Sequence, residues 1–303
     1  MIRLLHDNGQ TQLLDSSLLG DIHSCTSIHI TEAEVFLHDA LSKRIYSLPR
    51  LHHSICPFGP SLRTLTVSLI ATGPCMVAFS TGSALYSIGL NMFNPSIDSE
   101  SPQLELLAEW AVTSVCVGYK HIVVIAEMKA YAVGCNEYGQ LGIGCSEKVM
   151  FSRSPLPVAL PEGVTPVAVS AGSYHNALVT STGEVYTWGL GSYHRLGYTI
   201  EGNIAPAPTL LEDLLGVGDL TGGIPRGITL IACGTWHTIA ATRSSSGASD
   251  VYGWGWCKFG QCGHAAEVML TSPTLLDVEA DVLSLCAGAT YTALQTANSI
   301  MML

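Results

Sequence analysis

The sequence contains few charged side chains, and most of those are acidic. Lys, Arg, Asp and Glu make up 12% of the 303 residues, and 13 basic against 24 acidic side chains give a formal net charge of −11. Proteins that bind nucleic acid neutralise its phosphates with clusters of Lys and Arg. Because the sequence has no such basic stripe, we expect no direct binding to nucleic acid.

The sequence also leads us to expect no export signal and no membrane-spanning segment. Its start, "MIRLLHDNGQ", has no basic region followed by an apolar one, so we expect a reduced protein of the cytoplasm or the nucleus, despite 10 cysteines. Residues 64–95 contain no charged side chain, but "TGPC" and "STGS" interrupt them. The apolar runs between these breaks have the length of strands, whereas a spanning helix needs about 20 residues, so we expect no membrane segment.

Signatures of common catalytic sites are missing as well. The sequence has no Gly-x-Ser-x-Gly, no His-Glu-x-x-His and no phosphate loop with Gly-Lys-Ser/Thr, and the Gly-x-Gly of "GLGSYHRLG" lacks the helix and acid of a dinucleotide site. Cys257 and Cys262 are separated by four residues, unlike the Cys-x-x-Cys pairs of zinc and thiol-exchange sites. We therefore expect a protein that is not an enzyme and binds no metal or cofactor. Aligned with "WGLGSYHRLG" and "VGCNEYGQLG", the two cysteines are interpreted as small apolar packing residues.

A repeated unit is what the sequence does contain. "VAVSAGSYHNALVTSTGEVYTWGLGSYHRLG" (residues 167–197) reads as a strand, an Ala-Gly turn, a strand that begins with His, a Thr-Gly turn, a Tyr-x-Trp-Gly strand and a Gly-rich loop. The same order recurs in residues 114–144 and 229–263, and partial copies lie in residues 68–91, at the C-terminus and in "SCTSIHITEAEVFL". The first turns of these units fall at Thr26, Gly73, Gly118, Gly172, Gly234 and Gly288. They are roughly 45–60 residues apart, which is typical of propeller blades.

This repeat predicts an all-β protein, a β-propeller that forms a single domain over residues 1–303. Six repeat units are countable, and we expect six or seven blades, because a lone four-stranded sheet must stack on neighbours to bury its faces. The chain begins with "RLLHDNGQTQLL", which resembles the tail of a unit, and ends with the head of one. We therefore expect both termini to close the last blade; alternatively "SIMML" is the third strand of that blade, and the N-terminal piece adds outside it.

Histidine recurs at one place in three units, as His121, His175 and His237. A catalytic base is not needed several times over, so we expect each side chain to hydrogen-bond backbone inside its own blade. In the first unit the pattern aligns Thr26 with the turn glycine and keeps His29. We also expect the turn at Gly234 to require a positive φ, which favours glycine.

The repeat resembles that of the regulator of chromosome condensation family of β-propellers. The similarity is strongest in "SAGSYHNALVTSTGEVYTWG" and "NEYGQLGIG". Such propellers usually have seven blades, and the founding member is a guanine-nucleotide exchange factor for the GTPase Ran, while many relatives are scaffolds or modules of ubiquitin ligases. Exchange members tend to have acidic residues on the turn face, where this sequence has Lys120, Tyr174 and Trp236. The resemblance therefore favours a non-catalytic scaffold for protein–protein interaction.

Within the family, the chain is most similar to the compact type that acts as an α-tubulin suppressor and killer-toxin-insensitivity factor. The similarity lies in "DNGQTQLL", "VYGWGWCKFGQCG" and the final "CAGATYTAL". This type implies a small iron-binding diphthamide-biosynthesis protein as partner and a role in Elongator-dependent tRNA wobble-uridine modification and diphthamide biosynthesis. A secretion-regulating relative shares the Trp-Gly-Trp unit, so an exchange factor for a small Ras-like GTPase stays open as the alternative.

The loops of a propeller carry binding residues over a rigid frame. We expect a monomer whose turns present one partner-binding face, made by Tyr119, Lys120, Tyr174, Thr235 and Trp236. The alternative is that these side chains pack against the neighbouring blade. The long connection over residues 198–227 is acidic and apolar, and its "LLEDLL" predicts a short helical turn that offers Glu212 and Asp213 as further partner contacts. Its alternative interpretation is a slack connection.

Overall fold

The computed structural model describes residues 2–5, 11–14, 25–30, 34–39, 44–49, 56–57, 68–73, 76–89, 104–144, 149–221, 224–243, 248–263, 267–297 and 299–303. Before residue 68 it describes backbone strands only.

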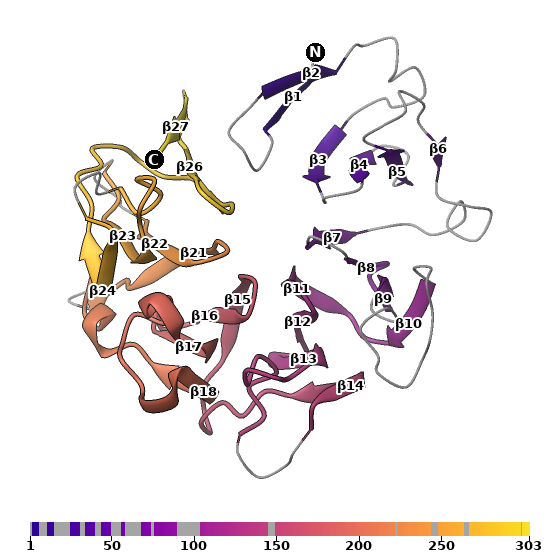
Figure 1. The fold of residues 1–303 in the computed structure, drawn as a ribbon, viewed down its shortest axis with the longest axis horizontal. Coiled ribbons are helices and arrows are strands. Elements are labelled where there is room, and N and C mark those ends of the chain that lie inside the picture. The colour runs from indigo at the N-terminus through magenta and orange to yellow at the C-terminus, as the bar shows by residue number, and fades with distance from the viewer. Residues whose placement is uncertain are drawn as a thin grey trace.

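Six antiparallel sheets follow one another along the described chain and surround a central opening, as Figure 1 shows. The first contains β3 (Cys25–Ile30), β4 (Glu34–Asp39), β5 (Arg44–Pro49) and β6 (Cys56–Pro57), and the second contains β7 (Leu69–Thr72), β8 (Val77–Ser80), β9 (Leu85–Ile88) and β10 (Leu104–Ala108). The third contains β11 (Val112–Val117), β12 (His121–Ala126), β13 (Lys129–Cys135) and β14 (Phe151–Pro157). The predicted all-β propeller is confirmed by this arrangement.

The remaining three sheets continue the ring toward the C-terminus. The fourth contains β15 (Pro166–Ala171), β16 (His175–Thr180), β17 (Val185–Leu190) and β18 (Ile204–Leu210), and the fifth contains β21 (Ile228–Cys233), β22 (His237–Thr242), β23 (Val251–Trp256) and β24 (Met269–Leu275). The sixth has three strands, β25 (Ser284–Ala287), β26 (Thr292–Gln295) and β27 (Ile300–Met302). Two hairpins, β1 (Ile2–Leu5) with β2 (Thr11–Leu14) and β19 (Leu220–Thr221) with β20 (Ile224–Pro225), and three 3₁₀ turns, η3 (Ser192–His194), η4 (Glu201–Asn203) and η5 (Glu212–Leu214), complete the described elements.

The hydrophobic core lies between neighbouring sheets. The second strands β12, β16 and β22 are buried at every residue, since a sheet on either side covers both of their faces. One apolar cluster joins Val123 of β12 to Leu178 of β16 and Trp188 of β17, and another joins Val179 of β16 to Trp254 of β23. The short apolar strands of the repeat are thus stable only when blades stack.

Two details of the predicted organisation differ from the structure. Thr26 and His29 both lie inside β3, so the predicted first turn at Thr26 is wrong. Ile300–Met302 is the third strand of the last sheet, and the described β1 and β2 pair with each other. Closure of the last blade by both termini therefore stays a prediction.

The long connection over residues 198–227 contributes regular structure and core packing to the propeller. It supplies β18 as the outer strand of the fourth sheet and the short turn η5, as the "LLEDLL" pattern predicts. Leu214 of η5 is buried in the core between the fourth and fifth sheets. The interpretation as a slack connection is wrong for these residues.

Candidate functional site

Each turn histidine links its own blade to the next one. The Nε2 atom of His121 lies 2.7 Å from Asn176 Oδ1, that of His175 lies 2.9 Å from Thr238 Oγ1, and that of His237 lies 2.9 Å from Thr292 Oγ1. These partners are the residues directly after the turn His or Tyr of the following unit. The expectation of a backbone hydrogen bond inside the same blade was therefore wrong, because each imidazole side chain extends across the interface between two blades.

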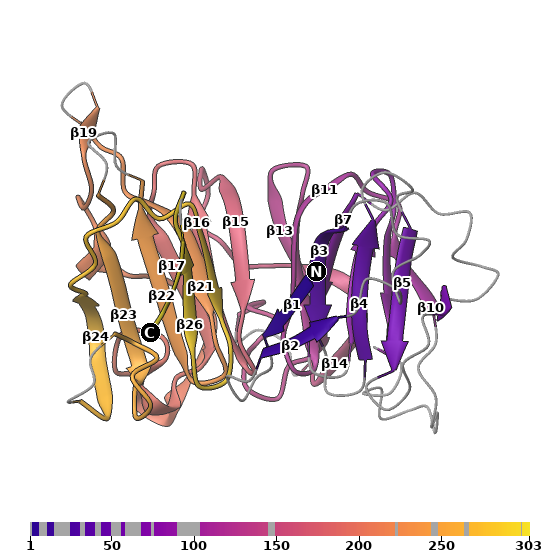
Figure 2. The same cartoon turned by 90° about the horizontal axis from the view of Figure 1, so that it is seen from above.

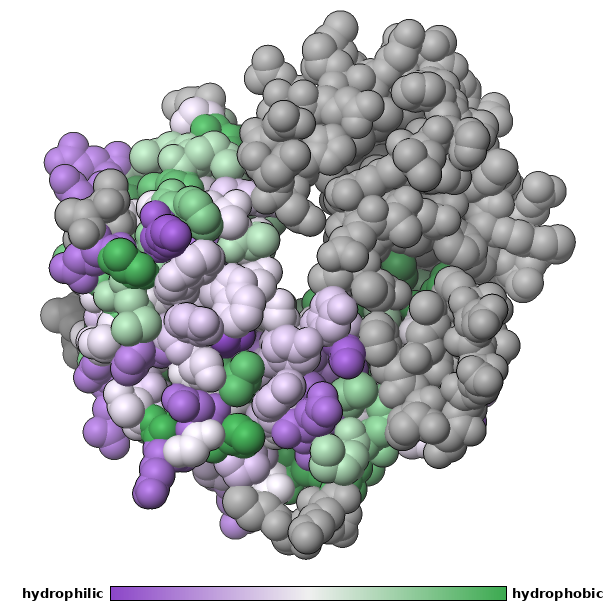
Figure 3. All heavy atoms as spheres, viewed as in Figure 1, coloured by the Kyte–Doolittle hydropathy of each residue, from purple (hydrophilic) through white to green (hydrophobic). Residues whose placement is uncertain are grey.

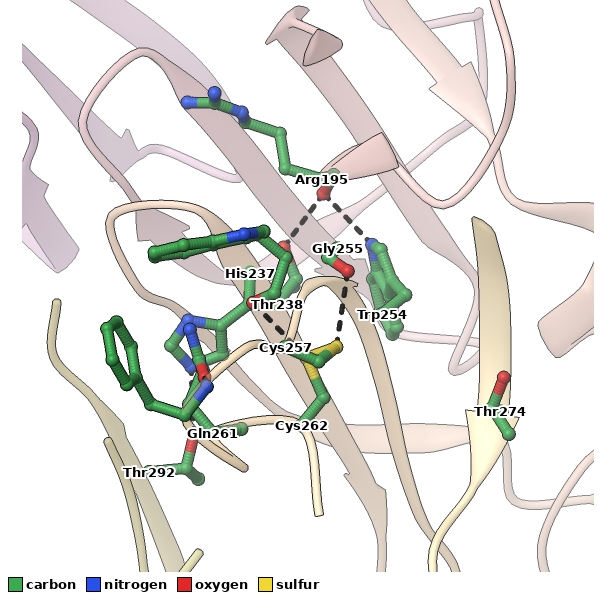
Figure 4. The surroundings of a disulfide bond; sticks show 12 residues. Arg195, His237, Thr238, Trp254, Gly255, Cys257, Gln261, Cys262, Thr274 and Thr292 are labelled. Atoms are coloured by element: carbon green, nitrogen blue, oxygen red, sulfur yellow. Dashed lines mark hydrogen bonds between the residues drawn. A yellow bond between two sulfur atoms is a disulfide. The ribbon is translucent and has the colours of Figure 1, made fainter. Parts of the chain in front are cut away.

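The Gly-rich loop after the third strand completes each of these links. The backbone carbonyls of Gln140, Arg195 and Gln261, which occupy equivalent loop positions, accept hydrogen bonds from Asn176 Nδ2, Thr238 Oγ1 and Thr292 Oγ1 respectively. Trp188 Nε1 and Trp254 Nε1 donate to the first two of these carbonyls, as Figure 4 shows for Arg195. Each loop is thereby fixed to the blade that follows it.

Burial keeps the turn histidines neutral. Desolvation lowers the pKa of His121 to about 4 and that of His237 to about 3, and it lowers the pKa of His175 well below its usual range, aided by the charge of Arg195. A general base needs access to substrate and a pKa near the working pH, and these rings have neither. Desolvation also raises the pKa of Cys233 to about 12, so this buried thiol is not an activated nucleophile.

The turn glycines are required by close packing. At Gly234 a Cβ atom would overlap the His237 ring and the carbonyl of Gly288, and Gly172 is enclosed in the same way by its own histidine and the next turn. Neither glycine has a positive φ. The expectation of a positive φ at Gly234 was therefore wrong, although the requirement for glycine stands.

The first turns and the Gly loops meet at one end of the ring. The N–H groups of Cys135, Leu190 and Trp256, which open the loops, donate to the carbonyls of the turn residues Lys120, Tyr174 and Trp236. We call this end the turn face, made by the turns 119–120, 173–174, 235–236 and 289–290 and by the loops 136–142, 191–197 and 257–263. It brings together five of the predicted site residues: Tyr119, Lys120, Tyr174, Thr235 and Trp236.

Aromatic rings on the turn face pair across the blades. The ring centroid of Tyr138, in one loop, lies 5.1 Å from that of Tyr174 in the next turn, and Tyr193 lies 5.3 Å from Trp236 in the same relation. Phe259 occupies the equivalent place in the following loop, but the turn after it has no aromatic residue, and Phe259 is 57% exposed. Turn aromatics thus pack on the neighbouring loop, as the alternative held, and they also reach the surface.

Three further ring contacts extend this set. Tyr119 lies 5.6 Å from Tyr174, and Trp256 lies 6.4 Å from Trp236 and 5.4 Å from Phe259. We call the seven residues the aromatic row: Tyr119, Tyr138, Tyr174, Tyr193, Trp236, Trp256 and Phe259. In Figure 3 the described surface beside the central opening is polar to intermediate in hydropathy, with separate apolar patches.

Positive side chains accompany the aromatic row. The guanidinium carbon of Arg195 lies 4.5 Å from the centroid of the Trp236 ring, Lys120 Nζ lies 5.8 Å from that of Tyr119, and Lys258 Nζ lies 5.9 Å from that of Phe259. Such contacts between cations and aromatic rings are favourable, most of all for Trp. In Figure 4 the Arg195 side chain points away from the disulfide, while its carbonyl is directed toward Thr238 and Trp254.

Cys257 and Cys262 form a disulfide in the structure, which corrects both their interpretation as small apolar packing residues and, for this pair, the expectation of reduced cysteines (Figure 4). Both residues are buried, and the bond closes the loop that carries Lys258 and Phe259. The equivalent positions in the third blade, Asn136 and Leu141, are joined by a hydrogen bond from the Leu141 N–H to Asn136 Oδ1. The same loop is therefore held by an amide in one blade and by a disulfide in another.

Glu212 and Asp213 do not lie on the turn face. Both are exposed in η5, which follows Leu210 after one intervening residue. Leu210 pairs with Tyr186, at the end of β17 opposite the His175 turn. The β19 hairpin that follows projects from this end of the ring in Figure 2. The structure thus divides the predicted site residues between two opposite ends.

Some residues of the turn face were not singled out from the sequence. These residues are in the Gly loops: Tyr138, Tyr193, Arg195 and Phe259. Alignment of the loops could have found them, because each loop has an aromatic residue two places before Gln140, Arg195 or Gln261. Among the described residues, no three His, Cys, Asp or Glu side chains gather to hold a metal ion. No described helix is long and apolar enough to cross a bilayer.

Comparison with known proteins identifies the repeat. Two models of the regulator of chromosome condensation (RCC1) repeat match the chain, one over residues 129–179 and 182–241 and the other over residues 167–195. The ultraviolet-B receptor UVR8 of Arabidopsis thaliana is 33% identical over 65% of this chain and 43% of its own length. Human E3 ubiquitin-protein ligase HERC2 is 27% identical over 71% of this chain and 4% of its own length, so the chain spans less than half of either relative.

Solved structures agree with the family match at the level of fold. Prp20p of Saccharomyces cerevisiae, whose structure was described with its binding properties to Gsp1p and histones, superposes with a TM-score of 0.70 at 15% identity, over 89% of this chain and 68% of Prp20p. The matched residues 129–241 contain the turns of His175 and His237 and the loops of Gln140 and Arg195. The chain is therefore a β-propeller in which residues 129–179 and 182–241 match the repeat of the regulator of chromosome condensation family.

Proposed function

We propose that this propeller is a non-catalytic scaffold that binds a protein partner through its turn face. The observation that carries the proposal is the aromatic row, which rests on a frame fixed from blade to blade and reaches the surface, with Tyr193 51% and Phe259 57% exposed. Tyr, Trp and Arg are the residue types enriched at interface hot spots. Related propellers that bind proteins support the same general role.

The partner that we propose is the small iron-binding diphthamide-biosynthesis protein, with a role in Elongator-dependent tRNA wobble-uridine modification. This part rests on the sequence similarity in "VYGWGWCKFGQCG" and "CAGATYTAL". Affinity purification from the native cell followed by mass spectrometry tests it. Recovery of the diphthamide protein or of Elongator is the expected result, and their absence beside another abundant partner contradicts it.

An exchange factor for a small Ras-like GTPase is the second candidate. The fold of Prp20p, described with its binding properties to Gsp1p, favours it. Against it, exchange members of the family tend to have acidic residues on the turn face, whereas here the residue before each turn histidine is Lys120, Tyr174 or Trp236. The acidic side chain near Tyr174 on this face is Glu137. Release of a labelled guanine nucleotide from the purified GTPase, measured with and without the propeller, distinguishes the two: the scaffold predicts equal rates.

The two ends of the ring provide the test of the turn face itself. Phe259→Ala removes an exposed ring and should weaken partner binding by about 1–4 kcal/mol with little effect on stability. The matched control is Glu212→Ala with Asp213→Ala, which removes exposed side chains at the opposite end. If the control weakens binding and Phe259→Ala does not, the partner binds near η5 instead.

A further inference from the structure

Arg195 is a buried charge without a carboxylate partner. The residue is fully buried, and it forms no ion pair with any residue that the structure describes. Arg195 Nε donates to the carbonyl of Ser192 at 2.8 Å and Nη1 to that of Thr235 at 3.3 Å, while Nη2 has no hydrogen-bond partner. Desolvation lowers its pKa to about 10, which leaves it charged at neutral pH. Such a group is costly to bury unless it is paired.

The other Gly loops show that the fold does not need arginine here. Gln140 and Gln261 occupy the equivalent positions, and their Oε1 atoms accept the N–H of Tyr138 and of Phe259, each at 2.8 Å. Arginine cannot accept a hydrogen bond, so Arg195 gives up this contact. The arginine is thus a departure from the repeat that costs the fold a loop contact and introduces an unpaired charge.

Three buried donor atoms on the turn face lack a hydrogen-bond acceptor. The Nε2 atoms of Gln140 and Gln261 are buried without a hydrogen-bond partner, as is Nη2 of Arg195. Lys258 is exposed beside Phe259, and Lys120 lies over Tyr119. The acidic residue of the turn face is Glu137, which lies close enough to Cys135 and Tyr174 to raise their pKa values. Against a net charge of −11 for the chain, this face is locally positive.

From these contacts we infer that the turn face binds an acidic protein segment, in which a carboxylate pairs with the Arg195 guanidinium while flanking apolar side chains pack on the aromatic row. A carboxylate fits the planar arginine fork with two parallel hydrogen bonds. The Tyr193 ring, half exposed and 5.8 Å from the guanidinium carbon, is the cover that must turn aside, and exposed rings change rotamer within nanoseconds. This inference rests on the proposed function, because it names the chemistry of the partner at the same face.

Arg195→Gln is the variant that the chain itself provides as a control, since Gln stands at this place in the third and fifth blades. We expect it to fold with an unchanged or raised melting temperature. The probe is a fluorescein-labelled peptide of alternating Glu and Leu, with a second peptide in which every Glu is Gln, and binding is measured by fluorescence anisotropy up to millimolar peptide. The acidic peptide should bind at least about tenfold more tightly, and Arg195→Gln should remove that preference while Arg195→Lys retains part of it.

Three outcomes overturn the inference: equal binding of the two peptides, an acidic preference that survives in the folded Arg195→Gln variant, or no saturable binding of the acidic peptide. The first is separable from failure of the proposed function. If both peptides bind equally and Phe259→Ala weakens both, the turn face binds protein segments but does not select acidic ones. If Phe259→Ala weakens neither, the turn face itself is not the binding surface.

Discussion

At the scale of single residues, the turn histidine acts as a neutral donor or acceptor between blades. His237 is enclosed by Gly234 below its ring and by Thr292 of the next blade at Nε2, so its protonation in the folded state is opposed by burial. Its pKa falls from 6.5 to about 3 on folding. Below pH 6.5 the unfolded chain therefore binds a proton that the folded chain excludes, and stability is lost as the pH falls from 6.5 toward 3.

His237→Gln tests this linkage, because a Gln amide does not titrate and can still bond Thr292. The wild-type protein should lose about 1.4 kcal/mol of unfolding free energy per pH unit through this one group below its unfolded pKa. Urea unfolding at a series of pH values from 7 to 4 is the measurement. The variant should show a shallower loss by that amount, and a parallel pH dependence in both proteins would contradict the assignment.

The requirement for glycine at the turn is tested by comparing Gly234, which is enclosed by close contacts, with Gly202, which has a positive φ and open space around it. Gly234→Ala places a methyl group against the His237 ring and the Gly288 carbonyl, and we expect a loss of about 3 kcal/mol. Gly202 has a φ of +74° and open space around its Cα, so Gly202→Ala should cost about 1 kcal/mol for backbone strain alone. Equal losses in thermal melts would show that the turn tolerates a side chain.

At the scale of elements, the Gly loop shows how one backbone shape is held by different chemistry. Asn136 bonds the N–H of Leu141 in the third blade, and the Cys257–Cys262 disulfide spans the same two positions in the fifth. Alignment of the loops predicts that these positions are equivalent, but it does not predict a covalent bond. Sequence spacing compares cysteines with known motifs, whereas the disulfide depends on the tight turn that brings the two Cα atoms to 5.2 Å.

Reduction of the disulfide should destabilise the fifth blade by about 2 kcal/mol, the chain-entropy estimate for so short a loop. We expect a reductant such as a phosphine to lower the melting temperature by a few degrees. The matched variant is Cys257→Asn with Cys262→Leu, which installs the residues of the third blade. It should be insensitive to reductant and about as stable as the oxidised protein. A wild-type melt that reductant leaves unchanged would mean that the two thiols are free in solution.

For the site, the sequence predicts the features that every blade shares but not the contacts between different blades. Periodic Gly and apolar strands predict the sheets, and the recurrent turn predicts that Tyr119, Tyr174 and Trp236 share one face, because every blade is built alike. The contact of Trp236 with Arg195 and Tyr193 is not predicted, since it joins a turn of one blade to the loop of another. The opposite placement of Glu212 also follows only from the strand pairing of β18 with β17.

At the scale of the whole molecule, the ring is a chain of blade-to-blade contacts that share acceptors. The carbonyl of Gln140 in the third blade accepts from both Asn176 and Trp188 of the fourth, and the carbonyl of Arg195 in the fourth accepts from both Thr238 and Trp254 of the fifth. Each of these carbonyls belongs to one blade, and the groups that donate to it belong to the next blade. Loss of order in one blade therefore removes hydrogen-bond partners from its neighbour. The described blades should therefore unfold as one cooperative unit.

Trp188→Phe tests this cooperativity at a single interface. The substitution removes the Nε1 donor to Gln140 and part of a fully buried ring, so we expect a loss of about 2–4 kcal/mol. Native-state hydrogen exchange then reports where protection falls. A cooperative ring predicts equal losses at the buried amides of β12, β16 and β22, although β22 contacts neither Trp188 nor Gln140 through any of these hydrogen bonds. Losses confined to β16 and β17, with β22 as protected as in the wild type, would mean instead that blades open one at a time and that the shared carbonyls do not couple them.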